Sequence, residues 1–189
     1  MKKILNAGCG ENTYGTHFVD KYPLRPEIKK CDLDCEKLPF KDNFFDEVVG
    51  INVLEHLTNM GFALKELHRV MKKGGKLILQ TDNANYWGYA ISKSHLGGYE
   101  DRDYFRSSGG DKHYALFTTH HLWNLAKKVG FKNIKVGYVK ESPEGSYVRS
   151  NLRFQNIRKL AKLIAWAALS TIPPLYRMKY GSLKLECVK

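Results

Sequence analysis

Two glycines and an aspartate near the amino terminus have the types and spacing of a nucleotide-binding site. Gly8 and Gly10 flank a cysteine directly after a short apolar run, and Asp20 closes the next short apolar run. Small residues in such a turn let a ligand approach the backbone, and a carboxylate can accept hydrogen bonds from ribose hydroxyl groups. The pattern therefore indicates a loop that cradles a nucleotide, followed by an acid that contacts its sugar.

The link between these residues is unusually short. Parallel neighbouring strands normally need a crossover of about a dozen residues or more. Here only Glu11–Thr16 separate Gly10 from the next apolar run, and Asn12 stands near the place of a usual third glycine. Either the crossover is an abbreviated loop, which we favour, or the two strands are not parallel.

The elements that must position these residues alternate between strand and helix patterns over the first 80 residues. A helix is predicted over Asn59–Met71, because its apolar residues share one face, and Gly74-Gly75 stands in the C-cap position. Strands are predicted over Lys3–Ala7, Thr16–Asp20, Ile28–Leu33, Phe44–Asn52 and Lys76–Asp82. This alternation predicts a three-layer α/β fold with a mostly parallel sheet.

The second half of the chain adds two helices and two strands. Thr118 or Thr119 caps the first helix and Gly130 ends it. A basic amphipathic helix over Asn151–Ile172 is stopped by Pro173-Pro174. Strands are predicted for KNIKVGYVK (132–140) and SLKLECVK (182–189). We expect one domain over residues 1–189, with the helix at 151–172 as an insertion.

Three segments together resemble the class I S-adenosylmethionine-dependent methyltransferases. KILNAGCG (3–10) is similar to their first motif, and VMKKGGKLIL (70–79) to their helix, turn and fifth strand. DCEKLPFKDNFFDEVVGINVLEHL (34–57) resembles members that carry an acid, Leu-Pro-Phe, Phe-Asp and Leu-Glu-His in this order. The resemblance implies a Rossmann-like methyltransferase fold with an antiparallel C-terminal strand, S-adenosylmethionine as the cofactor, and methyl transfer as the activity.

The resemblance also implies which residues bind the cofactor. They are Ala7, Gly8 and Gly10 beneath its methionine part, Asp20 at its ribose, Asp34 and Cys35 beside its adenine, and Asn52, Val53 and Leu54 near its methionine part. Asp32 takes the place of Asp34 if the third strand ends two residues earlier. Each of these positions can also be read as a turn residue or a packed strand end.

Methyl transfer to a hydroxyl group needs a base, and histidine suits this role because its ordinary pKa is near neutrality. His56 follows the fourth strand, and His113 follows the long aromatic segment after the fifth. Either can be the base, and His56 can equally be a packed residue behind the site. Tyr86 and Trp87, just past the fifth strand, are expected to wall the acceptor pocket or to pack in the core.

The acceptor is constrained mainly by absences in the sequence. No Asn/Asp-Pro-Pro-Tyr/Phe motif follows the fourth strand, and no cysteine stands where an enzyme that attacks cytosine would carry its nucleophile. We therefore expect a small-molecule, lipid-linked or glycan-linked acceptor, methylated at oxygen, ahead of a nucleic acid. Residues 83–117, a long aromatic-rich connection, are expected to form a lid on the acceptor side.

Other functions remain open on the sequence. A nicotinamide oxidoreductase would need a third glycine where Thr13 stands. It would also need an acid about 20 residues after the glycine turn, whereas Asp20 comes only ten residues after Gly10. A binding protein that has lost turnover is compatible with the shortened loop. A methyltransferase acting on RNA is compatible with the charge.

The net charge of +12 is concentrated near the carboxyl end. Residues 149–189 hold nine lysines and arginines against one acid, Glu186. Such a cluster attracts polyanions. The helix predicted over Asn151–Ile172 therefore either contacts an anionic membrane or RNA, or simply presents a solvated face. The missing crossover helix would leave apolar surface exposed, which the helix at 151–172 or a second subunit in a homodimer could cover.

Composition bounds the remaining properties. The chain is 43% hydrophobic and no stretch approaches the roughly 20 apolar residues that span a bilayer. Four cysteines without a CxxC pair suit a reducing compartment. We therefore expect a cytoplasmic protein, peripheral to the membrane if the basic helix binds lipid. No metal is expected, because the clustered histidines have no cysteine beside them.

Overall fold

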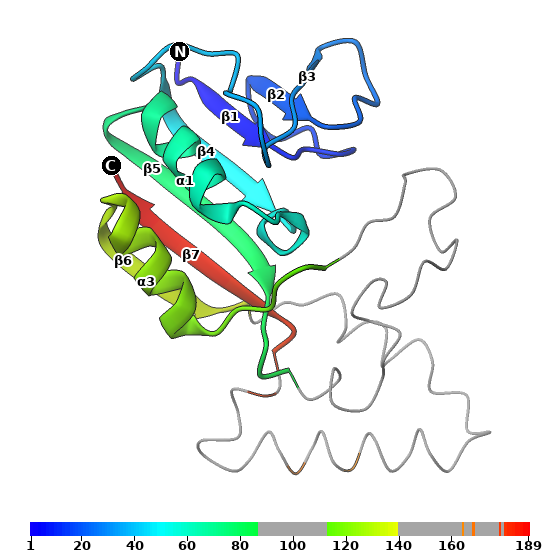
Figure 1. Ribbon diagram of the computed structural model, residues 1–189, viewed down its shortest axis with the longest axis vertical. Coiled ribbons are helices and arrows are strands. Elements are labelled where there is room, and N and C mark those ends of the chain that lie inside the picture. The colour runs from blue at the N-terminus through cyan, green and yellow to red at the C-terminus, as the bar shows by residue number, and fades with distance from the viewer. Residues whose placement is uncertain (87–112, 140–163, 165–167, 169–177, 179) are drawn as a thin grey trace, which may run out of the picture.

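The computed structural model describes residues 1–86, 113–139, 164, 168, 178 and 180–189. A single sheet has the strand order β3-β2-β1-β4-β5-β7-β6 (Figure 1). The strands are β1 (Ile4–Ala7), β2 (His17–Asp20), β3 (Ile28–Lys30), β4 (Phe45–Ile51), β5 (Met71–Asp82), β6 (Lys132–Tyr138) and β7 (Ser182–Val188). β1 to β5 pair in parallel and β7 is antiparallel to both of its neighbours. The predicted α/β fold with an antiparallel C-terminal strand is confirmed.

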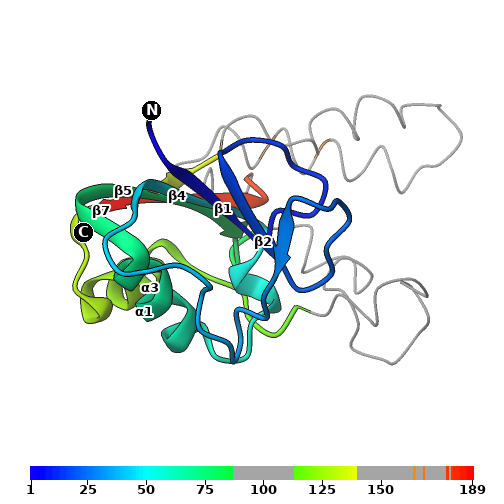
Figure 2. The same cartoon turned by 90° about the horizontal axis from the view of Figure 1, so that it is seen from above.

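Two helices cover one face of the sheet (Figure 2). α1 (Met60–Val70) buries its apolar side, including Leu64 and Leu67, against the sheet. α3 (Thr119–Val129) begins at Thr118, whose side chain accepts a hydrogen bond from the His121 backbone N–H, and ends at Gly130 with a φ of 110°. Of the two alternatives for its N-cap, Thr118 is therefore the one adopted.

The predicted C-cap at Gly74-Gly75 is wrong. α1 ends at Val70, and β5 begins at the next residue, because Met71 pairs with Phe45 of β4. The two glycines lie within β5, where the register with β4 shifts in a bulge. A Cβ atom on Gly75 would lie 2.9 Å from the Lys72 carbonyl oxygen, so glycine serves close backbone approach at this position.

The link between β1 and β2 is an abbreviated loop. Residues 8–16 contain no helix, yet β1 and β2 pair in parallel, with Leu5 opposite His17. The alternative that the two strands are not parallel is therefore excluded. The helices α1 and α3 lie on the same face of the sheet, so neither covers the opposite face (Figure 2).

Polar side chains occupy part of the sheet face opposite α1 and α3. Asn6 and Glu47 alternate with the core residues of β1 and β4, so they face away from α1, and both are buried. Glu47 accepts hydrogen bonds from the Tyr14 hydroxyl and the Lys2 ammonium, each at 2.7 Å. Burial alone would raise the pKa of Glu47, but these two partners outweigh it and hold the pKa below its usual range. The short loop thus covers the neighbouring strands through hydrogen bonds.

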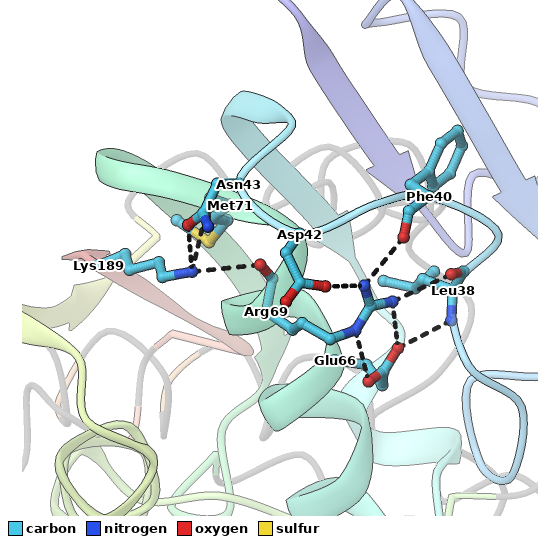
Figure 3. Close-up of polar contacts among 8 residues, drawn as sticks. All are labelled: Leu38, Phe40, Asp42, Asn43, Glu66, Arg69, Met71 and Lys189. Atoms are coloured by element: carbon cyan, nitrogen blue, oxygen red, sulfur yellow. Dashed lines mark hydrogen bonds and ion pairs between the residues drawn. The ribbon is translucent and has the colours of Figure 1, made fainter.

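An arginine on α1 holds the connection between β3 and β4 (Figure 3). The Arg69 guanidinium donates to both carboxylate oxygens of Glu66, to Asp42, and to the carbonyl oxygens of Leu38 and Phe40. Glu66 also accepts from the Leu38 backbone N–H at 3.0 Å. The hydrogen bond from Arg69 lowers the pKa of Glu66. The Leu-Pro-Phe stretch is therefore fixed to α1 by one ion-pair network.

A lysine from the carboxyl-terminal part of the chain closes the end of α1 (Figure 3). The Lys189 ammonium donates to the carbonyl oxygens of Arg69 and Met71 and to the Asn43 side chain. A cation is favourable here because the last carbonyl groups of a helix carry partial negative charge. Burial lowers the pKa of Lys189.

Most of the expected lid and of the expected basic helix lies outside the described residues. The described ends of the lid meet, because the Ala84 backbone N–H donates to the Phe117 carbonyl oxygen at 2.8 Å. From the expected helix at 151–172, Ile164 and Ala168 are described, and both have helical backbone and are exposed. Among the described helices, none has the length and apolar character to cross a bilayer. All four cysteines are free.

Candidate functional site

A cavity of about 590 Å³ opens at the carboxyl ends of β1 to β4. Its wall combines the turn after β1, the β2–β3 connection, the turn after β3 and the segment that follows β4. Open α/β sheets bind ligands at this edge, where the strand order reverses, and here it reverses between β1 and β4. The position and size suit a small organic ligand.

The turn after β1 brings bare backbone to the cavity. The backbone N–H groups of Gly8 and Cys9 donate to the Val19 carbonyl oxygen, which fixes the turn against β2. Gly8 has a φ of 67°, and a Cβ atom on it would lie 2.5 Å from Cγ2 of Val53. Gly10 has a φ of 49° with nothing within 4 Å of its Cβ position. Gly8 is therefore required by packing, and Gly10 leaves space that a side chain would fill.

Asp20, at the end of β2, lies in the cavity wall beside this turn. One of its carboxylate oxygens accepts from the Gly10 backbone N–H and the other from the Tyr22 backbone N–H, both at 2.8 Å. These bonds fix the orientation of the carboxylate. Each oxygen can accept a further hydrogen bond, so Asp20 retains the capacity to bind two hydroxyl groups.

Asp34 and Asp32 both lie in the wall after β3, and β3 ends at Lys30, before the predicted end at Leu33, which meets the condition under which Asp32 takes the place of Asp34. The Asp34 carboxylate accepts from the Thr58 hydroxyl and from the Asn59 backbone N–H, each at 2.7 Å, which ties it to the start of α1. Asp32 forms an ion pair with Lys21 at 2.8 Å. Burial would raise the pKa of Asp32, but the hydrogen bond from Lys21 outweighs it and lowers that pKa. Cys35, by contrast, is exposed and outside the wall.

The end of β4 contributes a residue in an unusual conformation. Asn52 has a φ of 54°, lines the cavity, and donates its backbone N–H to the Gln80 carbonyl oxygen. Asparagine tolerates this left-handed conformation better than most residues. The next residue, Val53, also lines the cavity, whereas Leu54 and Ala7 are buried in the core beneath it. The predicted residues thus divide between the wall and its support.

The two candidate histidines lie side by side, although 57 positions separate them in the sequence. Their ring centroids are 4.5 Å apart in an edge-to-face arrangement, and His56 lines the cavity. The buried Nδ1 atom of His113 lies 3.0 Å from Asp82, which is ion-pair distance without hydrogen-bond geometry. Tyr114 belongs to the wall and His113 does not, so His113 stands behind His56.

A fully buried glutamate connects these elements beneath the cavity. The backbone carbonyl oxygen of Glu55 accepts from the N–H groups of Tyr114 and Ala115, which holds the two histidine segments together. Its side chain accepts from the Thr81 hydroxyl at 2.6 Å, and among the described residues the second carboxylate oxygen has no hydrogen-bond partner. Burial raises the pKa of Glu55.

The two expected acceptor-wall residues are not brought to the cavity by the described structure. Tyr86 is half-buried, its backbone N–H donates to the Asn83 carbonyl oxygen, and it is absent from the wall. Trp87 lies outside the described residues. Among the described residues no group of three or more His, Cys, Asp or Glu is arranged to hold a metal ion.

Sequence reasoning missed several wall residues that follow the predicted ones directly. Tyr22 and Leu24 come from the β2–β3 connection just after Asp20, and both are exposed. Thr58 and Tyr114 come from connections after β4 and before α3. The predicted topology could have identified them, because residues that follow parallel strands meet at one edge of the sheet.

Sequence comparison identifies a known domain in the chain. Residues 16–79 match the family model described as a methyltransferase domain. An uncharacterized protein of Methanocaldococcus jannaschii is 54% identical over 94 residues, which cover 42% of this chain and 40% of that relative. The ubiquinone/menaquinone biosynthesis C-methyltransferase of Chromobacterium violaceum is 52% identical over 46 residues, 24% of this chain and 19% of that protein. The sterol 4-C-methyltransferase of Caenorhabditis elegans is 44% identical over 46 residues, 24% of this chain and 14% of that protein.

The chain therefore spans less than half of the length of these three relatives.

Solved structures extend the likeness to the whole fold. A methyltransferase of Thermotoga maritima has a TM-score of 0.63 at 17% identity, covering 100% of this chain and 83% of that one. One of Archaeoglobus fulgidus has a TM-score of 0.60 at 15% identity, covering 100% and 86%. The [4+2]-cyclase SpnF shares the fold as well, with a TM-score of 0.57 at 17% identity, covering 100% and 75%.

The cyclase shows that the fold by itself does not fix the reaction. The domain match is more specific, because it spans β2, β3, β4 and α1, the elements that carry most of the cavity wall. Taken with the strand order, it shows that this chain contains a methyltransferase domain within the Rossmann-like fold of S-adenosylmethionine-dependent methyltransferases.

Proposed function

We propose that the cavity binds S-adenosylmethionine and that the protein transfers its methyl group to the hydroxyl oxygen of a small-molecule, lipid-linked or glycan-linked acceptor. One observation carries this proposal. The bare turn at Gly8 and Gly10, the carboxylate of Asp20 and the end of β4 wall a single cavity, and most of its lining residues lie in the segment 16–79 that matches a methyltransferase domain.

The residues present fit this cofactor. The open Cβ position of Gly10 leaves room for a ligand against the backbone, and Asp20 is fixed with acceptor capacity to spare. Asp32 and Asp34 place further carboxylates at the neighbouring strand end. Acidic groups suit a ligand that carries a sulfonium and an ammonium group.

The chemistry of the proposed reaction follows from the bound cofactor and from the side chains beside it. When bound, S-adenosylmethionine supplies a methyl group on a positively charged sulfur, which a nucleophile takes by direct displacement. In this proposal His56, which lies in the wall, accepts the proton that an acceptor hydroxyl gives up. His113 packs against it, with Asp82 at its Nδ1 atom. Removing the proton leaves more electron density on the attacking oxygen.

Two short matches favour a lipid-linked acceptor among the three classes. The C. violaceum relative is named for ubiquinone and menaquinone biosynthesis and the C. elegans relative for sterols, both apolar ring compounds. Both names specify transfer to carbon, so a carbon acceptor is the alternative outcome to oxygen. Deuterated-methyl S-adenosylmethionine, incubated with the protein and separate lipid, polar and RNA extracts, would show by mass spectrometry which fraction and which atom receives the label.

Binding is tested first by calorimetry with S-adenosylhomocysteine. Asp20→Asn removes the charge at the ribose position, and we expect affinity to fall about tenfold or more, the loss of one or more hydrogen bonds to a charged group. Glu11→Gln is the matched control, because it removes an exposed carboxylate from the adjacent loop outside the cavity wall. Equal affinity of the two variants would contradict the assignment of Asp20.

A binding protein without turnover is the second candidate. The Asp34 carboxylate is already engaged on both oxygens by Thr58 and Asn59, and the crossover helix is absent. Tight binding of S-adenosylhomocysteine without transfer of label to any of the three extracts would favour this candidate.

A further inference from the structure

The loop that replaces the crossover helix is held on its inner side by asparagine side chains. Oδ1 of Asn12 accepts from the Tyr14 backbone N–H at 2.8 Å and from the Asn6 side chain at 3.2 Å. Asn6 also donates to the Tyr14 carbonyl oxygen at 3.0 Å, and the Asn12 backbone N–H donates to the Cys9 carbonyl oxygen at 2.8 Å. These bonds shape the loop locally, as Asx turns do.

On its outer side the same loop is held by one guanidinium group. Arg25, in the β2–β3 connection, donates from Nη1 to the Glu11 carbonyl oxygen at 2.9 Å and from Nη2 to that of Asn12 at 3.2 Å. Its Nε atom donates to Glu27 at 2.8 Å, and the group lies 5.5 Å from the ring centre of Phe18 on β2. All three guanidinium nitrogens are therefore used, and the side chain is only 24% exposed.

Arg25 thereby joins two segments that each continue into the cavity wall. The loop that it contacts continues from Gly8 and Gly10, and its own connection carries Tyr22 and Leu24. We propose that Arg25 is a positioning residue for the cofactor site: it holds the glycine turn in its binding conformation in place of the missing crossover helix. This inference rests on the proposed function, because it assigns the residue to the same cavity.

The chemistry of the contact requires arginine. A planar guanidinium can reach two successive carbonyl oxygens while a third nitrogen is held by a carboxylate. An ammonium group in the same place keeps the charge but lacks the fork. Arg25→Lys should therefore retain part of the effect, and Arg25→Met should lose it.

Hydrogen exchange of the ligand-free protein tests the clamp without reference to any ligand. We expect the Asn12 and Tyr14 amides to exchange several-fold faster in Arg25→Met than in the wild type, with Arg25→Lys between them. Lys29→Met is the matched control, because Lys29 on β3 also lies over an aromatic ring, that of Phe40 at 4.8 Å. Unchanged exchange in Arg25→Met would overturn the proposal.

Calorimetry with S-adenosylhomocysteine tests the consequence for the site. We expect the dissociation constant to rise about tenfold in Arg25→Met and by an intermediate factor in Arg25→Lys. In Lys29→Met we expect it to stay unchanged. If the wild type binds and Arg25→Met binds equally well, the positioning role is wrong. If the wild type itself does not bind, the proposed function fails, and hydrogen exchange alone then decides whether Arg25 holds the loop.

Discussion

Replacing Gly8 with alanine separates two reasons why the turn after β1 needs glycine. Gly8 and Gly10 both have left-handed backbone angles, with φ of 67° and 49°. A Cβ atom would meet Val53 at 2.5 Å from Gly8, but nothing within 4 Å from Gly10. Gly10→Ala is therefore the control, because it carries the backbone cost without the steric cost.

The expected magnitudes follow from these two terms. A left-handed conformation costs a residue with a Cβ atom about 1–2 kcal/mol. A forced contact in a packed region adds about 1–3 kcal/mol, and Val53 cannot easily turn away because its branched Cβ fixes the rotamer. We expect the free energy of unfolding to fall by about 1–2 kcal/mol in Gly10→Ala and by about 2–5 kcal/mol in Gly8→Ala.

Urea unfolding followed by circular dichroism measures both losses. Val53→Ala removes both methyl groups that a Cβ atom on Gly8 would meet, so the Gly8→Ala/Val53→Ala double variant should be more stable than the sum of the single changes predicts, by about 1–3 kcal/mol. Equal losses for the two alanine variants, or a coupling energy near zero, would refute the steric explanation of Gly8.

Two further predictions concern charged groups behind the site. Arg69→Met should lower the free energy of unfolding by about 3 kcal/mol. This is the low end of the range for breaking a buried ion pair, because the Arg69 side chain is 26% exposed. A urea titration would measure the loss. Glu55→Gln tests the buried carboxyl. Burial raises the pKa of Glu55, so its ionisation opposes folding, and the wild type should lose stability relative to this variant as the pH rises above the ordinary value of 4.5. A stability difference that is constant between about pH 4.5 and 8 would contradict this reasoning.

The sequence identified those parts of the site that local chemistry determines. The turn at Gly8 and Gly10 and the acid at Asp20 were predicted from their spacing together with the family resemblance, and the structure brings all three to one cavity. Tyr22 and Leu24 were missed because the course of a seven-residue connection depends on contacts such as that of Arg25, which no local pattern encodes.

The elements of the fold were likewise predictable where a local pattern of apolar residues determines them. Alternating apolar patterns located every strand of the sheet and both described α-helices. The glycine pair after α1 was misassigned because Gly74-Gly75 suits a C-cap and a bulge equally well. Only the pairing of Met71 with Phe45, across 26 positions of the chain, decides between them.

The place of β7 between β5 and β6 has a consequence for how the nascent chain assembles. β6 precedes β7 in the sequence, yet it joins the sheet only through β7. During synthesis the edges of β5 and β6 therefore stay open until residues 182–188 have emerged. Open edges invite pairing between molecules, and outward lysines such as Lys132 and Lys135 are a known defence against it. The cations on β6 thus protect the chain while its neighbouring strand has yet to be made.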